Sequence, residues 1–168
     1  GSRPLGTAFF PFVYATGFER GKHPATMLTD EQMDLRKLQV GGLEGVAGEW
    51  GMEVSNPAYE GEITSRRALA MSKIAATVEL GQTIGLSNVH AVSENFGLRL
   101  PSEKLLNRMI VGFDNVSMPD VVSAYSTFPR GGSRITARHY ILEILDVEGK
   151  IVYPLNGNGP ALESQEVC

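Results

Sequence analysis

The sequence holds very little of the chemistry from which metal and redox sites are built. Its 168 residues include a single cysteine, Cys168, so neither an internal disulfide nor a cysteine-based zinc site can form. The three histidines, His23, His90 and His139, are far apart and lack the spacing of metal ligands. We interpret each as a surface or structural histidine, and we expect neither a metal nor any other cofactor.

A strong charge of one sign and long apolar runs are also absent. The net charge is −4, so no broad cationic surface is available to attract nucleic acid. No apolar stretch approaches the roughly 20 residues that a membrane-spanning helix needs. Hydrophobic residues nevertheless make up 42% of the chain, which is typical of a folded domain with a sizeable core. We expect one domain over residues 1–168, with 155–168 as a linker or tail.

Local patterns predict a mainly helical (α+β) domain with one small β-hairpin. Apolar periodicity and a closing glycine predict a helix over 7–20 and a longer helical stretch over 64–84. Ser117 can cap a helix over 118–129, which has a proline in its first turn. Alternating apolar residues on either side of a Glu-Gly turn predict a hairpin over 138–154.

Weaker signals predict shorter elements between these helices. Thr29 and Gln32 have the spacing of a capping box, which favours a short helix at that point. Ser87 is a candidate N-cap for another short helix that ends at Gly97. Residues 101–110 are expected to form one more. Because each of these signals is local, the packing of the whole domain decides whether the element forms.

Four segments then match, in order and spacing, the pattern of one enzyme family. Residues 3–14 read R-P-L-G-T-A-F-F-P-F-V-Y, where the family has a run like R-x-P-G-S-x-F-K-P-F-x-Y. Residues 67–74 read R-A-L-A-M-S-K-I, where it has r-A-L-x-x-S-x-N. Segments 118–132 and 141–151 match a later helix and hairpin. The chain therefore resembles the transpeptidase domain of the bifunctional (class A) penicillin-binding proteins of bacterial cell-wall synthesis.

The departures from this family pattern fall on its catalytic positions. The resemblance implies that a serine nucleophile and its lysine base, three residues apart on one helix face, are replaced here by Thr7 and Phe10. Ser72 matches the serine of the second motif, but Ile74 replaces the asparagine, and Lys73, one position off, is expected to face elsewhere. The third motif, a K-[ST]-G strand, is absent.

The resemblance implies the helical part of a penicillin-binding transpeptidase or serine β-lactamase-like fold, with the central sheet largely outside this chain. Thr7 and Ser72 are expected to lie near each other as degenerate remnants of the site. The implied role is a non-catalytic structural or partner-binding module in peptidoglycan synthesis, on the extracytoplasmic face of the inner membrane. Its partner would be a stem peptide or another cell-wall synthesis protein. A membrane contact would come only through other parts of the parent protein.

Two other functions stay open from the sequence alone. Thr7 could act as a weak acyltransferase nucleophile with a base recruited from elsewhere. Alternatively, the chain could be a helical interaction domain whose similarity to the family is incidental.

Overall fold

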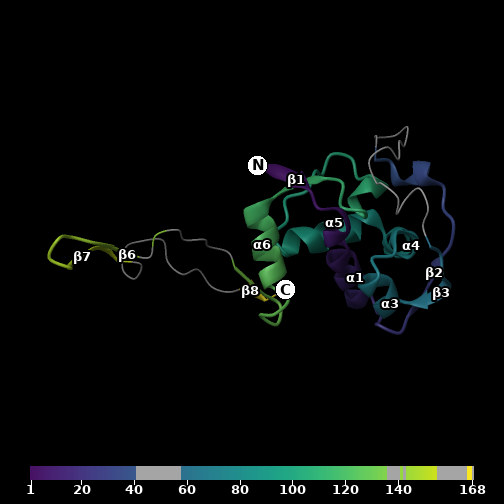
Figure 1. The fold of residues 1–168 in the computed structure, drawn as a ribbon, viewed down its shortest axis with the longest axis horizontal. Helices are drawn as coiled ribbons and strands as arrows, with labels where there is room; N and C mark the ends of the chain where they lie inside the picture. The colour runs from purple at the N-terminus through teal and green to yellow at the C-terminus, as the bar shows by residue number, and fades with distance from the viewer. Residues whose placement is uncertain (41–57, 136–140, 142, 155–165, 168) are drawn as a thin grey trace.

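Helix α1 (Phe10–Glu19) runs through the middle of the helical body, as the computed structural model shows (Figure 1). The structure describes residues 1–40, 58–135, 141, 143–154 and 166–167. Three further helices pack against α1: α3 (Ser65–Ala70), α4 (Ile74–Ile84) and α5 (Leu86–Asn95). The last helix, α6 (Met118–Ser126), lies beside α5.

The central place of α1 follows from its composition, because it is apolar on nearly every side. A helix with that character is stable in water only when other elements surround it. Its buried residues are Phe10, Phe12, Val13, Tyr14, Thr16 and Gly17. Pro11 is tolerated because it lies in the first turn, where its missing N–H has no partner to lose. A 3-10 turn, η1 (Gly6–Phe9), leads into the helix, so the helix predicted over 7–20 is confirmed.

The strands of the described residues form four sheets, each of two antiparallel strands. The pairs are β1 (Ser2–Pro4) with β4 (Asn115–Ser117), β2 (Met27–Asp30) with β3 (Gly61–Thr64), β5 (Ser133–Arg134) with β8 (Glu166–Val167), and β6 (Glu143–Leu145) with β7 (Ile151–Pro154). The last pair confirms the predicted hairpin and lies at the far end of Figure 1 from the helical body. The first pair holds the start of the chain beside α6.

The short helix predicted to end at Gly97 is confirmed as α5, but three local predictions are wrong. Thr29 lies in β2 and not at a helix start, since its strand pairs with β3. Helix α5 begins at Leu86 with Gly85 as its N-cap, two residues before the Ser87 predicted to cap it. Residues 101–110 form only the 3-10 turn η3 (Asn107–Met109). A second 3-10 turn, η2 (Leu35–Leu38), precedes the segment 41–57, which lies outside the described residues.

The helical stretch predicted over 64–84 is two helices. Its start is confirmed, because the Thr64 side chain accepts a hydrogen bond from the Arg67 N–H at 3.3 Å. Helix α3 then ends at Ala70, and α4 begins at Ile74. Ser117 caps α6 as predicted, by accepting from the Asp120 N–H at 3.3 Å. The break between α3 and α4 falls on the segment that carries Ser72.

Gly112 fixes the position of η1. Its carbonyl accepts hydrogen bonds from the N–H groups of Leu5 and Gly6 at 2.9 and 3.0 Å. Gly112 has φ +66°, and a Cβ placed on it would lie 2.2 Å from the Gly6 carbonyl oxygen. No side chain can therefore be added without moving the backbone that leads into α1.

We expect Gly112→Ala to destabilise the domain by about 3 kcal/mol, from left-handed backbone strain plus overpacking. Gly21→Ala is the matched control, because Gly21 has φ +83° but nothing within 4 Å of its Cβ position. That variant should lose only about 1 kcal/mol. Urea unfolding followed by circular dichroism measures both. Equal losses would show that the Gly112 contact with η1 does not matter.

Candidate functional site

The predicted nucleophile position, Thr7, lies in the η1 turn just before α1. Its side chain is half-buried, and its carbonyl accepts from the Phe10 N–H. Two hydrogen-bonding groups fix the turn. The Gly112 carbonyl accepts from the Gly6 N–H, and the Tyr125 hydroxyl donates to the Ala8 carbonyl. Among the described residues, no side chain hydrogen-bonds with the Thr7 hydroxyl. Within the described residues, no basic side chain is therefore hydrogen-bonded to the Thr7 hydroxyl.

Phe10, which stands at the expected lysine position, is a core residue. Its exposed fraction is 0%, as is that of Phe12 two residues later. This burial confirms the simplest interpretation of an aromatic residue at that point of a helix. A buried phenyl ring neither accepts a proton nor carries charge, so position 10 supplies no acid–base chemistry to Thr7.

Ser72 owes its place to the way α3 ends. The Lys73 N–H donates to the Ala68 carbonyl at 2.9 Å, and the Ser72 N–H donates to the Leu69 carbonyl at 3.1 Å. These two bonds make a Schellman motif, in which the residue after the helix cap adopts the left-handed conformation. Ser72 is that residue, with φ +52°. The motif breaks the helix and leaves the Ser72 side chain exposed.

Ser72 is unusual among the residues that close helical turns in this chain. Within the described residues, the same pair of hydrogen bonds closes four other helices or helical turns, and each of those has glycine in the left-handed position. They are Gly21, Gly97, Gly112 and Gly131. A residue with a Cβ costs about 1 kcal/mol there. The serine at position 72 therefore lowers the stability of the fold relative to a glycine there.

Ile74, at the expected asparagine position, begins α4 and is half-buried against the core. The sequence predicts that Lys73 faces away from the site, and the structure gives the contacts of its side chain. The Lys73 ammonium lies 2.9 Å from an Asp30 carboxylate oxygen and 2.9 Å from a Glu60 carboxylate oxygen. It also donates to the Ala58 carbonyl at 2.5 Å. Asp30 is the last residue of β2, and Glu60 immediately precedes β3.

This charge cluster was not predicted from the sequence, because its members lie up to 43 positions apart (Asp30 to Lys73). Arg67 completes it, with its Nε 2.6 Å from the second Glu60 oxygen. Burial by itself lowers the pKa of Lys73, but hydrogen bonds and attraction from Glu60 and Asp30 outweigh it, so the pKa is raised. Hydrogen bonds from Lys73 and Arg67 lower the pKa of Glu60. Lys73 is therefore an ammonium at neutral pH and cannot accept a proton.

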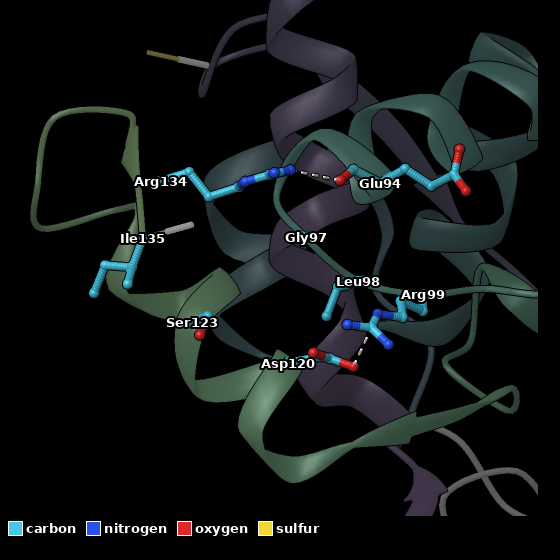
Figure 2. A pocket seen from close by; sticks show the side chains of 8 residues that line it. All are labelled: Glu94, Gly97, Leu98, Arg99, Asp120, Ser123, Arg134 and Ile135. Carbon is cyan, nitrogen blue, oxygen red and sulfur yellow. Dashed lines mark hydrogen bonds and ion pairs between the residues drawn. The ribbon is translucent and has the colours of Figure 1, made fainter. Parts of the chain in front are cut away.

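A polar pocket of about 250 Å³ lies between α5 and α6 (Figure 2). Its lining residues are Glu94, Gly97, Leu98, Arg99, Asp120, Ser123, Arg134 and Ile135. Most of its charged groups already hold the fold together. Arg134 donates to the Glu94 and Asn95 carbonyls at 3.3 and 3.2 Å, and Asp120 accepts from the Ser117 hydroxyl at 2.7 Å. We therefore interpret the pocket as the place where α5, α6 and β5 are held together, and not as a ligand site.

Two other kinds of site are absent from the described part of the chain. Within those residues, no group of three His, Cys, Asp or Glu side chains could hold a metal ion. None of the helices there has the length and apolar character that crossing a membrane requires.

Comparison with curated proteins finds relatives named penicillin-binding protein 1A. The chain is 31% identical over 150 residues to penicillin-binding protein 1A of Neisseria gonorrhoeae, and 29% identical over 150 residues to that of Neisseria cinerea. Penicillin-binding protein 1A of Rickettsia typhi is 25% identical over 151 residues. The matches cover 89–90% of this chain but only 18% of each relative. A scan against models of known protein families finds no match.

Solved structures agree with the sequence relatives on the fold. Penicillin-binding protein 1A of Haemophilus influenzae superposes with a TM-score of 0.74 at 22% identity, over 91% of this chain and 22% of that one. The imipenem acyl-enzyme complex of penicillin-binding protein A from M. tuberculosis gives 0.74 at 15% identity, over 99% and 40%. The chain is a relative of the penicillin-binding proteins with a transpeptidase-type fold. More particularly, it corresponds to a segment of those named penicillin-binding protein 1A, so the idea of an incidental similarity is wrong.

The left-handed Ser72 generates a stability prediction. Ser72→Gly should raise the free energy of unfolding by up to about 1 kcal/mol, because it removes the Cβ strain. Ser72→Ala keeps the Cβ and should stay within about 0.5 kcal/mol of the unmodified chain. Urea unfolding measures both. A clear loss of stability in the alanine variant would mean that the hydroxyl supports the fold, which would contradict its assignment as an exposed remnant.

The charge cluster of Asp30, Glu60, Arg67 and Lys73 generates a second stability prediction. Lys73→Met leaves Asp30, which is 2% exposed, without its cation and should cost about 3 kcal/mol. Arg36→Met is the control, because the Arg36–Asp34 pair is 79% and 39% exposed and should be worth about 1 kcal/mol or less.

The same variant should remove a pH dependence. Because the pKa of Lys73 is raised in the folded state, Lys73 stabilises the fold at pH values below the ordinary lysine pKa, and this stabilisation is lost as the pH rises through the raised pKa. Because the pKa of Glu60 is lowered, Glu60 stabilises the fold at pH values above the ordinary glutamate pKa, and this stabilisation is lost as the pH falls through the lowered pKa. The stability difference between the unmodified chain and Lys73→Met should therefore be largest between about pH 5 and pH 10. A difference that does not vary with pH would contradict the ion cluster.

Proposed function

We propose that this chain is the helical part of a transpeptidase-type domain in a protein that takes part in peptidoglycan synthesis, and that it does not catalyse acyl transfer. The observation that carries the proposal is the complete burial of Phe10 where the family resemblance expects the lysine base. The relatives named penicillin-binding protein 1A support the cell-wall assignment. Because the chain spans 18% of their length, the activity of the whole protein is part of the proposal.

The chemical argument concerns the proton on Thr7. A hydroxyl becomes a useful nucleophile when a neighbouring base removes its proton, which typically contributes about 10²–10⁴-fold to the rate. Phe10 cannot take this proton, and Lys73 is held as an ammonium by two carboxylates. The methyl group of threonine also restricts the hydroxyl more than serine would. Acyl transfer through Thr7 therefore lacks its base.

A non-catalytic role is consistent with what the chain retains. The Schellman turn keeps an exposed hydroxyl at Ser72, and η1 keeps a half-buried one at Thr7. The helices that these two turns adjoin, α3 and α1, pack together. We propose that both hydroxyls face a remnant of the substrate cleft, with their oxygens within about 10 Å, since a working pair must approach hydrogen-bond distance. The region then acts as a structural or partner-binding module for a stem peptide or another cell-wall protein, at the extracytoplasmic face of the inner membrane.

Weak acylation through Thr7 is the second candidate, because two structural neighbours are described as β-lactam complexes. One is the PonA1 protein of Mycobacterium tuberculosis with penicillin V, at a TM-score of 0.72 and 15% identity over 92% of this chain and 42% of that one. Our proposal and this alternative differ in one observable. Only a chain that forms an acyl-enzyme keeps a covalent β-lactam.

We expect no covalent adduct when the chain is incubated with excess fluorescent penicillin. The positive control is a penicillin-binding protein 1A that labels under the same conditions. The double variant Thr7→Ser with Phe10→Lys should also stay unlabelled, because it lacks the asparagine at position 74 and the strand expected to supply an oxyanion donor, worth about 2.7–4 kcal/mol.

The double variant places an ammonium in the core and should lose several kcal/mol of stability. Thr7→Ser with Phe10→Met is therefore made as a folded control, because methionine fits an apolar site at low cost. Stoichiometric labelling of the unmodified chain would overturn the proposal in favour of acyl transfer.

A further inference from the structure

The Glu60 carboxylate lies in a cradle made by two cations. Its Oε2 is 2.6 Å from the Arg67 Nε, and its Oε1 is 2.9 Å from the Lys73 Nζ. Each carboxylate oxygen thus has a positively charged donor of its own. Two separate charge-assisted donors, one for each oxygen, form an arrangement by which proteins recognise carboxylate ligands.

The charges of this cluster balance only while Glu60 is in place. Asp30 is buried and pairs with Lys73 at 2.9 Å, so two carboxylates face two cations. Without the Glu60 charge, the cradle keeps an excess of one positive charge. The Glu60 and Arg67 side chains are 28% and 54% exposed, so solvent and a small anion can reach the cradle.

The backbone next to Glu60 has hydrogen bonds that do not use the Glu60 carboxylate. The Glu60 N–H donates to Asp30 at 3.1 Å, and the nearby Ala58 carbonyl accepts from Lys73 at 2.5 Å. The backbone at this point is therefore held independently of the Glu60 carboxylate. Withdrawal needs only rotation of the side chain about its own bonds.

We propose that Arg67 and Lys73 form a carboxylate-binding site that Glu60 fills from within the chain, and that the carboxylate of a ligand binds there when Glu60 withdraws. The site lies at the turn between α3 and α4, next to Ser72 in the sequence, and it stands independently of the cell-wall assignment. A tethered carboxylate has an effective concentration in the millimolar range or above, so it excludes weak free acids.

The test removes the internal carboxylate and offers an external one. Glu60→Gln and Glu60→Ala are titrated with sodium acetate, and NMR follows the Arg67 Nε–H and the amides of residues 58–73. Acetamide, which has the shape of acetate but no charge, tests whether the charge is needed. Sodium chloride at matched ionic strength tests whether the shifts come only from salt screening of the charged groups. Asp34→Asn is the matched control variant, because it frees Arg36 from an exposed pair whose carboxylate makes no second ion pair within the described residues.

We expect saturable acetate shifts with millimolar affinity in both Glu60 variants, at least tenfold tighter than in the unmodified chain. Adding Arg67→Met to Glu60→Gln should abolish the saturation. Acetamide, sodium chloride and the Asp34→Asn variant should give no saturable shift. If folded Glu60 variants respond to acetate no differently from Asp34→Asn, the cradle is only a structural ion cluster and the proposal is wrong.

Discussion

The burial of the α1 helix constrains everything else in this domain. Phe12 lies at its centre, with its ring edge-on to Phe96 at 5.2 Å and to Tyr125 at 5.3 Å between ring centres. These contacts join α1 to the end of α5 and to α6. Because α1 is surrounded, the residue at position 10 must be apolar or must bring its own partners into the core. An isolated ammonium there would cost several kcal/mol. The chemistry of the site is thus decided by the packing of the core.

The charges that remain near Ser72 are used for structure. Lys73 joins three segments that are distant in the sequence: the end of β2, the residues before β3 and the turn between α3 and α4. Its carboxylate partners keep it protonated, so it can hold these segments together by ion pairs but is a poor base. The same turn places an exposed serine in a strained left-handed conformation. The segment thus combines an ion cluster with an exposed serine hydroxyl.

The sequence predicted the parts that depend on local chemistry. The helix over 7–20, the Ser117 cap and the hairpin follow from apolar periodicity, capping and turn residues, and the family resemblance supplied the fold. The break at Ser72 was missed because left-handed helix ends usually carry glycine. A helix was wrongly predicted at Thr29 because pairing with a partner strand overrides a capping box. Asp30, Glu60 and Arg67 were missed because their grouping exists only after the chain has folded.

The account depends most directly on the claim that no base is available to Thr7. The measurement that tests it is the pKa of the Lys73 ammonium, followed through its side-chain nitrogen by NMR in the folded protein. We predict a value above its ordinary 10.5, because Asp30 and Glu60 favour the charged form. A value near neutrality would mean that the carboxylates do not hold Lys73 as an ammonium at physiological pH, which would contradict the claim that Lys73 cannot accept a proton.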